Sequence, residues 1–128
     1  MTDVIVIFAV SDVEASSRLY SEVFGFAIEV KSPNYHELRM SRAAALGLYQ
    51  RDAFPKNFEG RLGTHSPGEA QPAELYVRVA DAPATVDALQ RRGLVLQSSL
   101  SMRPWGENVA YFLDPDGFVV AVAQATSA

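Results

Sequence analysis

Residue types that could catalyse a reaction or bind a metal are scarce in this chain. No cysteine occurs among its 128 residues, which excludes disulfides, thiolate metal ligands and cysteine nucleophiles. The two histidines are His36 and His65. His36 adjoins Glu37, but neighbouring residues of a strand point to opposite faces, so the two do not form an acid-base pair. His65 precedes Ser66 without a third group to orient it, so we expect no catalytic pair there.

The overall composition indicates a soluble globular protein. Hydrophobic residues make up 48% of the sequence and charged residues 20%. The formal net charge is -4 and no basic run is present, so nucleic acid is not an expected partner. The first residues lack a signal-peptide pattern, and the apolar run from Val4 to Val10 is too short to span a bilayer. We therefore expect a cytoplasmic protein with no membrane partner.

The first half of the chain has the pattern of one helix among four strands. The β-branched run Val4 to Val10 predicts a strand that is buried on both faces. Asp12 is suited to cap a helix over residues 12–24, and Gly25 to end it in a left-handed conformation. Three further strands are predicted over residues 26–31, 35–40 and 44–50.

The same pattern returns after a long irregular segment. Residues 51–72 are rich in proline and glycine and show no period, which indicates a linker or a long functional loop. A strand is then predicted over residues 75–79, followed by a helix that Asp81 caps and Gly93 ends. The remaining strands are predicted over residues 95–102, 109–113 and 118–124, with a tight hairpin at 114–117 between the last two.

The two halves repeat at a nearly constant offset. Asp81 follows Asp12 by 69 residues, and Gly93 follows Gly25 by 68. Repetition of an incomplete unit suggests that each half buries its apolar face against the other half or against a second chain. We therefore predict a single domain over residues 1–128, made of module one (1–50), a linker loop (51–72) and module two (73–128).

Several motifs in this order resemble those of the vicinal oxygen chelate superfamily, which comprises glyoxalases, bleomycin resistance proteins and dioxygenases. They are the run from Val10 to Asp12, the helix segment from Leu19 to Phe26, Pro104-Trp105-Gly106, and the run from Tyr111 to Gly117. The resemblance covers nearly the whole chain. It implies an α+β fold of two βαβββ modules, in which a curled mixed sheet surrounds a cleft and the helices lie outside. It also implies a homodimer.

The resemblance further shows where metal ligands would stand in the metal-using members. The first-strand position of the first module is Ile5, and its counterpart in the second module is Glu74. The last-strand position of the second module is Ala121, and the corresponding position of the first is Gly47. One carboxylate cannot hold a zinc, iron, nickel or manganese ion, which needs about three protein ligands. We therefore predict no metal and no other cofactor, as in the bleomycin-resistance-like members.

Strand alternation gives the two modules different cleft faces. Leu75, Val77 and Val79 suit the helix, which leaves Glu74, Tyr76 and Arg78 on the other face. In the first module the equivalent face is aliphatic, with Ile5, Ile7 and Ala9. Seven residues are accordingly predicted to contact a small-molecule ligand: Ile7, Tyr49, Phe54, Glu74, Tyr76, Arg103 and Trp105.

Each of these residues also has an ordinary structural interpretation. Glu74 could pair with an arginine, and Tyr49 and Tyr76 could fill a core. Trp105 could close over a ligand or cap the edge of the core, and Arg103 could bind an anionic ligand or lie at the surface. Phe54, like Phe58, could contact the ligand, the cleft or a second subunit.

The leading hypothesis is a small-molecule binding protein with an apolar and aromatic cleft and no metal. The carboxylate of Glu74 favours a cationic or amine-bearing ligand. The competing hypothesis is a metal-dependent lyase or oxygenase with an atypical site built from Glu74, His36, His65 or a partner residue. A third is a scaffold whose dimer surface is the functional part. The sequence assigns neither catalytic residues nor a substrate.

Overall fold

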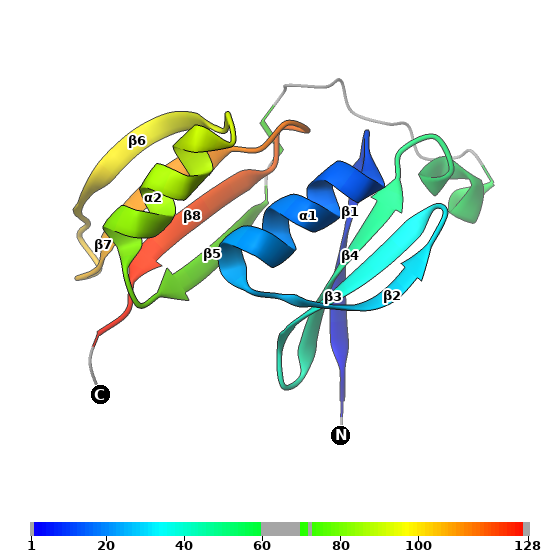
Figure 1. Ribbon diagram of the computed structural model, residues 1–128, viewed down its shortest axis with the longest axis horizontal. Helices are drawn as coiled ribbons and strands as arrows, with labels where there is room; N and C mark the ends of the chain where they lie inside the picture. The colour runs from blue at the N-terminus through cyan, green and yellow to red at the C-terminus, as the bar shows by residue number, and fades with distance from the viewer. Residues whose placement is uncertain (1, 60–69, 72, 127–128) are drawn as a thin grey trace. The chain divides into compact units, whose positions relative to one another are not determined.

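The chain folds into two successive βαβββ modules in the computed structural model, which describes residues 2–59, 70–71 and 73–126 (Figure 1). Its contacts divide it into two compact units, Met1–His65 and Ser66–Ala128, here called unit 1 and unit 2. Each unit has one helix and one mixed four-stranded sheet. The predicted α+β class and the two modules are thereby confirmed.

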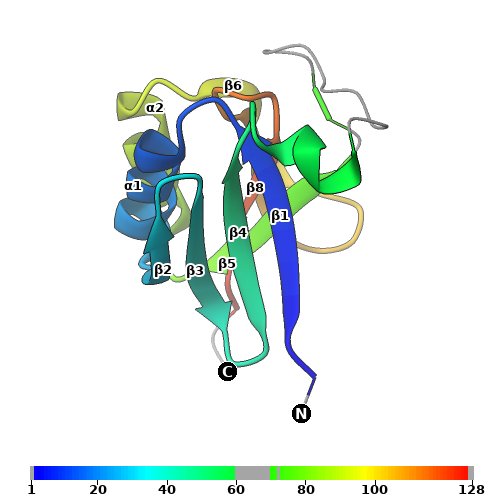
Figure 2. The same ribbon diagram turned by 90° about the vertical axis from the view of Figure 1, so that its right-hand side faces the viewer.

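Unit 1 consists of β1 (Val4–Val10), α1 (Val13–Phe24), β2 (Ala27–Ser32), β3 (Tyr35–Ser41) and β4 (Ala44–Gln50). The strand order is β1-β4-β3-β2, as Figure 2 shows, with β1 parallel to β4 and the other neighbours antiparallel. Helix α1 packs on β3 and β4. The core between helix and sheet contains Phe8, Val10, Leu19, Tyr20, Leu38, Leu46 and Leu48.

Unit 2 repeats this arrangement with β5 (Glu74–Val79), α2 (Ala82–Arg91), β6 (Val95–Met102), β7 (Asn108–Leu113) and β8 (Val119–Gln124). The strand order is β5-β8-β7-β6, and β5 is parallel to β8. Helix α2 packs on β6 and β8. The buried apolar residues of unit 2 include Leu89, Leu94, Ala110, Phe112, Val120 and Val122.

Local signals in the sequence account for the ends of both helices. The Asp12 carboxylate accepts from the amide of Ala15 at 3.0 Å, and the Asp81 carboxylate accepts from the amide of Ala84 at 3.1 Å. These bonds satisfy amides that have no partner within the helix. Gly25 follows α1 with a φ of 74°, which confirms the predicted left-handed end.

The hairpin between β7 and β8 also forms as predicted. The amide of Gly117 donates to the carbonyl of Asp114 at 3.0 Å, and Gly117 has a φ of 85°. The Asp114 carboxylate accepts from the amides of Asp116 and Phe118 at 2.9 and 2.8 Å. Its side chain thus satisfies the donors of a buried turn.

One expectation about local structure is wrong. Strand β1 is not buried on both faces, because it lies at an edge of its sheet; Val4, Ile5, Val6 and Ile7 are 42–53% exposed. The described part of the predicted linker, residues 51–72, contains a 3-10 helix, η1 (Phe54–Phe58), with Pro55 in its first turn. Proline fits there because the first amides of a helix need no helical partner.

The division between the units falls inside the predicted linker, between residues 65 and 66. That the whole chain forms a single domain stays a prediction.

Neither α1 nor α2, the α-helices of the described residues, is long and apolar enough to cross a membrane.

Candidate functional site

The sheet of unit 2 has one face that α2 does not cover, here called the polar-aromatic face. Strand pairing sets Tyr76 of β5 and Tyr111 of β7 on either side of Ala121 of β8. Both tyrosines pack against a buried cluster of Val109, Ala121 and Ala123. Because alanine side chains are short, the two rings flank a low central strip of the sheet. Val109, Ala121 and Ala123 are fully buried, so the accessible groups of this face are the side chains around the strip and not the strip itself.

Trp105 joins this face through a direct side-chain contact. It lies between β6 and β7, and its indole Nε1 donates to the Tyr76 hydroxyl at 3.0 Å. The side chain is 54% exposed, so most of the indole stays available for contact. The structure therefore brings together Tyr76 and Trp105, two of the residues predicted to bind a ligand.

Glu107 and Arg78 complete the hydrogen bonding around Tyr76. The Tyr76 hydroxyl donates to Glu107 Oε1 at 2.9 Å, and Arg78 donates to both carboxylate oxygens at 2.8 and 3.1 Å. The Arg78 guanidinium also lies 5.5 Å from the centre of the Tyr76 ring. The Arg78 guanidinium, and after it the Tyr76 hydroxyl, hold the pKa of Glu107 below its usual range. Glu107 is thus an ionised carboxylate that is engaged on both oxygens.

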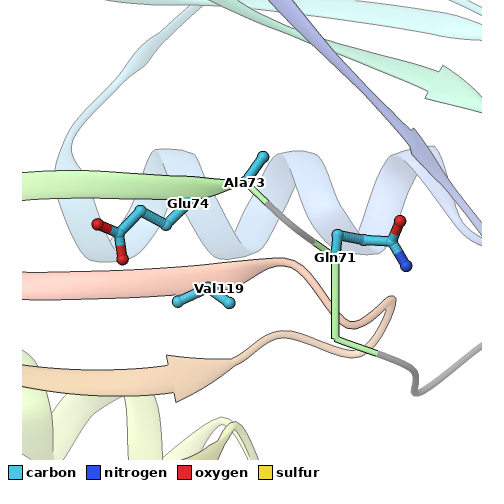
Figure 3. Close-up of a pocket in the computed structure, with 4 residues that line it drawn as sticks. All are labelled: Gln71, Ala73, Glu74 and Val119. Atoms are coloured by element: carbon cyan, nitrogen blue, oxygen red, sulfur yellow. The ribbon is translucent and has the colours of Figure 1, made fainter.

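Glu74 is arranged in the opposite way. It begins β5 and is exposed, and its side chain has no ion pair or hydrogen bond with any other described residue. It lines an open pocket of about 450 Å³ together with Gln71, Ala73 and Val119. Figure 3 shows the Glu74 carboxylate beside Val119, its register partner on β8. Burial, and then the negative charge of Glu74, raise the pKa of Tyr111. Within the part of the chain that the structure describes, the Glu74 carboxylate therefore lies at an open pocket without a cationic partner.

Arg103 already has partners within unit 2. Its guanidinium donates to the Val109 carbonyl at 2.7 Å, to the Ser98 hydroxyl at 2.9 Å and to the Ser99 carbonyl at 2.9 Å. It also lies 5.0 Å from the centre of the Tyr111 ring. These bonds fix Arg103 beside the polar-aromatic face, where it supports the Tyr111 ring. Its predicted contact with an anionic ligand stays a prediction.

The corresponding face of unit 1 carries a row of aromatic side chains that contact one another. The rings of Tyr35 and Tyr49 lie 5.6 Å apart, and Tyr49 meets Phe54 edge-on at 5.9 Å. Phe54 in turn packs against Phe58 at 5.1 Å, so η1 extends this aromatic row. The structure thus brings together Tyr49 and Phe54, two further residues predicted to bind a ligand.

Tyr35 covers the part of this face next to Gly47. A Cβ atom on Gly47 would lie 2.6 Å from the Tyr35 hydroxyl and 2.9 Å from Ile7 Cγ1. The Tyr35 hydroxyl donates to Glu37 Oε1 at 2.7 Å. Burial and this carboxylate strongly raise the pKa of Tyr35, which keeps it a neutral donor. Ile7, a predicted ligand-binding residue, therefore packs beside a tyrosine from its own unit.

The residues present do not fit a metal. In unit 1, Ile5 has no donor atom, and the ring of Tyr35 lies against Gly47. At the two corresponding ligand positions of unit 2, Glu74 offers a carboxylate, whereas the side chain of Ala121 has no donor atom. The described residues contain no group of three histidine or acidic side chains close enough to hold an ion. We derive no chemistry through a metal.

His36 lies away from both faces described above. It is buried on the α1 side of β3, with its Nε2 atom 3.6 Å from Glu14 Oε1. Burial lowers the pKa of His36, and the Glu14 carboxylate partly opposes this effect. Glu37 points to the opposite face, as strand alternation predicts. His65 lies outside the described residues.

Sequence reasoning missed three contributors to these faces. Tyr111 could have been found, because it alternates with the inward-facing Ala110 and Phe112 on a strand that was predicted correctly. Tyr35 could have been noticed as the partner of Tyr49, but its approach to Gly47 depends on strand register. Glu107 gave no local signal, since its partners Tyr76 and Arg78 are about thirty residues away.

Two βαβββ modules, each with a helix on one face and an aromatic face opposite, define a class of small paired-module α+β proteins. The sequence model of the Glyoxalase/Bleomycin resistance protein/Dioxygenase superfamily matches residues 3–122, and the chain belongs to that superfamily. No curated protein matches the chain significantly.

Solved structures show the same fold. A glyoxalase-related enzyme from Fulvimarina pelagi is 22% identical, with a TM-score of 0.79 over 98% of this chain and 88% of the other. A family enzyme from Burkholderia phytofirmans PsJN is 20% identical, with a TM-score of 0.79 over 95% and 97%. TnmS3, an antibiotic binding protein from Streptomyces sp. CB03234, is 25% identical, with a TM-score of 0.70 over 98% of each chain.

Proposed function

We propose that this protein binds a flat small molecule without a metal, as bleomycin-resistance-like members of its superfamily do. The observation that carries this proposal is the polar-aromatic face of unit 2. There, Tyr76 and Tyr111 flank Ala121, the indole of Trp105 is exposed, and Glu74 lines an open pocket without an ion-pair partner among the described residues. A few polar groups at the edge of an apolar surface are typical of small-molecule sites.

The chemistry of these residues favours binding over catalysis. A general acid or base needs a titratable group that can exchange a proton near neutral pH. Glu107 is held ionised by Arg78 and Tyr76, and the pKa of Tyr111 is raised rather than lowered. Glu107 is a weak base whose two oxygens are already engaged, and Tyr111 stays protonated, so neither group is poised to take up a proton at neutral pH. Glu74 can contribute charge and a hydrogen-bond acceptor, which are properties of a recognition site.

The arrangement favours a planar ligand with a basic nitrogen. Aromatic side chains stack on flat rings, and an unpaired carboxylate attracts a protonated amine. Arg78 does not offset Glu74, because its charge is already neutralised by Glu107. The likeness to TnmS3, an antibiotic binding protein, supports a small organic ligand.

The proposal also includes further ligand contacts, the location of the protein and its association into a dimer. Ile7, Tyr49 and Phe54 are proposed ligand contacts of unit 1, and Arg103 a proposed contact of unit 2. We also propose that the protein is cytoplasmic and acts as a homodimer. The exposed apolar residues of β1, at the edge of its sheet, support association with a second copy.

A fluorescence titration tests the binding proposal. Trp105 is the only tryptophan in the sequence, so quenching of its emission reports directly on the proposed site. We expect the planar cation 9-aminoacridine to quench it saturably, and the planar anion acridine-9-carboxylate to bind more weakly. Glu74→Gln should weaken binding of the cation by about two- to fivefold, the usual effect of an exposed ion pair.

Asp87→Asn is the matched control for Glu74→Gln. It removes one exposed carboxylate from α2, which covers the opposite face of the same sheet. Binding that responds equally to both variants would reflect net charge and contradict a specific role for Glu74. If neither acridine quenches Trp105, this ligand class is wrong, and the dimer surface becomes the candidate functional part.

Metal analysis separates the proposal from the enzymatic alternative. Protein purified without a chelator should contain no stoichiometric metal. Its melting temperature should not rise specifically with magnesium, manganese, iron, nickel, cobalt or zinc, since only an ion that binds the folded state stabilises it. A stoichiometric ion with clear stabilisation would favour a lyase or oxygenase with an atypical site.

A further inference from the structure

A chain of hydrogen bonds connects four side chains of unit 2 and ends at Glu107. Trp105 donates to Tyr76, Tyr76 donates to Glu107, and Arg78 donates to both oxygens of Glu107. We propose that Glu107 is the positioning residue of the polar-aromatic face and holds the Trp105 indole in its binding orientation through Tyr76. This inference rests on the proposed function, because it explains how that face is ready before a ligand arrives.

The donor and acceptor properties of the four side chains give this series of hydrogen bonds one direction. An indole and a guanidinium can only donate, whereas a hydroxyl has one proton to donate and can also accept. When the Tyr76 proton points to Glu107, the lone pairs of the hydroxyl are free to accept from Trp105. Glu107 is the only member that accepts without donating. Removal of its carboxylate therefore releases the proton of Tyr76 and weakens the orientation of every other member.

The backbone near Trp105 fixes its position but not the direction of its ring. The amide of Gly106 donates to the carbonyl of Arg103 at 2.9 Å, and the amide of Arg103 donates to the carbonyl of Glu107 at 2.8 Å. Gly106 has a φ of 91°, which allows this tight turn. Because Trp105 is 54% exposed, packing restrains only part of the ring. The bond to Tyr76 is the hydrogen bond that directs the indole among the described residues.

Burial distinguishes the roles of the two charged members. The side chain of Glu107 is 17% exposed, whereas that of Arg78 is 65% exposed. Glu107 is therefore the inner member, in contact with Tyr76, and Arg78 covers it from the solvent side and balances its charge. The ion pair keeps Glu107 ionised and thus a strong acceptor for the Tyr76 hydroxyl. Arg78 supports the position of Glu107 and need not touch the ligand.

A ligand that stacks on a ring already held in place loses less binding free energy to the ordering of that ring. A ligand that stacks on a mobile indole must first restrict it, and each immobilised side chain weakens association by a factor of a few to about ten. With Trp105 and Tyr76 both held by Glu107, this cost is met when the protein folds. The expected consequence is about a tenfold loss of affinity when Glu107 is removed.

The first experiment uses the free protein. Time-resolved fluorescence anisotropy of Trp105 should show little fast local motion in the wild-type protein. The amplitude of this motion should rise in Glu107→Ala and in Tyr76→Phe, which removes only the hydroxyl. Glu107→Gln retains an acceptor without the charge and should give an intermediate amplitude. Asp87→Asn on α2 should match the wild-type protein. If Glu107→Ala does not fold, Tyr76→Phe provides the same test.

The second experiment adds 9-aminoacridine as the probe. The expected result is binding to the wild-type protein and about tenfold weaker binding to Glu107→Ala, with Glu107→Gln in between. Unchanged anisotropy in both Glu107→Ala and Tyr76→Phe would overturn the proposal, as would equal affinity of the wild-type and Glu107→Ala proteins. If Trp105 becomes mobile as expected but the wild-type protein does not bind the probe, the positioning role stands and the proposed ligand class fails.

Discussion

The ring of Tyr35 lies so close to Gly47 that no side chain fits between them. A Cβ on Gly47 would lie 2.6 Å from the Tyr35 hydroxyl and 2.8 Å from its Cε1 atom. Both distances are shorter than van der Waals contact allows. Glycine at position 47 is therefore a condition for Tyr35 to lie across β4 and reach Glu37. The residue that leaves a superfamily ligand position empty also makes room for a tyrosine.

This relationship predicts that Gly47→Ala destabilises the protein through Tyr35. We expect a loss of about 1–3 kcal/mol in the free energy of unfolding, the usual cost of overpacking a filled site. Urea denaturation measures this quantity. In a Tyr35→Ala background the penalty should become smaller, because the Tyr35 ring is removed while Ile7 Cγ1 still lies 2.9 Å from the new Cβ. An equal penalty in both backgrounds would show that Tyr35 is not the cause.

Stability should fall in mild acid because of His36. Burial lowers the pKa of His36 in the folded protein, whereas in the unfolded chain it titrates at about 6.5. The unfolded state therefore binds the proton more readily, and stability is lost as the pH falls from about 6.5 through the lowered folded pKa. The charged groups that face His36 are Glu14 of α1, which opposes this shift, and Lys31 of β2, which adds to it.

Substitution of His36 by leucine should flatten this pH dependence. Urea denaturation of the wild-type protein between pH 7 and 5 should show falling stability, with a slope of at most about 1.4 kcal/mol per pH unit from one histidine. His36→Leu should remove most of that slope. His65→Gln measures what the second histidine contributes. A slope that follows His65 rather than His36 would contradict the assignment.

The two helix caps offer a test of the predicted single domain. Asp12→Ala and Asp81→Ala each remove the acceptor of one helix-end amide and should cost about 0.5–2 kcal/mol. If the chain unfolds as one cooperative domain, each substitution shifts one common transition in thermal or urea unfolding. Two transitions, each sensitive to only one of the substitutions, would show instead that the units unfold separately.

Strand β1 predicts where two copies associate. Val6 is 47% exposed on this edge strand, and an exposed apolar edge favours pairing with another chain. Sedimentation velocity should show a dimer that Val6→Lys shifts toward monomer. Val30→Lys, on the other edge of the same sheet, is the matched control and should leave the dimer intact. A monomeric wild-type protein would contradict the proposed homodimer.

Local patterns in the sequence were enough to predict the elements and their repetition. Asp12, Gly25 and Asp81 act within a few residues of chain, and each is where its helix needs a cap or an end. The alternation of Glu74, Tyr76 and Arg78 with Leu75 and Val77 likewise depends only on strand geometry. Predicted strand limits agree with the structure within one residue for this reason.

Long-range pairing decided what the sequence could not. The burial of β1 depends on which strand is placed at the edge, and an apolar run gives no information about strand order. The contact of Tyr35 with Gly47 depends on register, and the bonds of Glu107 to Tyr76 and Arg78 depend on a turn that returns the chain to β5. The sequence by itself determined two βαβββ modules and the residue types of their faces. Only the tertiary structure decided that Tyr35 covers one face and that Glu107 organises the other, because both depend on distances between residues that are remote along the chain or on neighbouring strands.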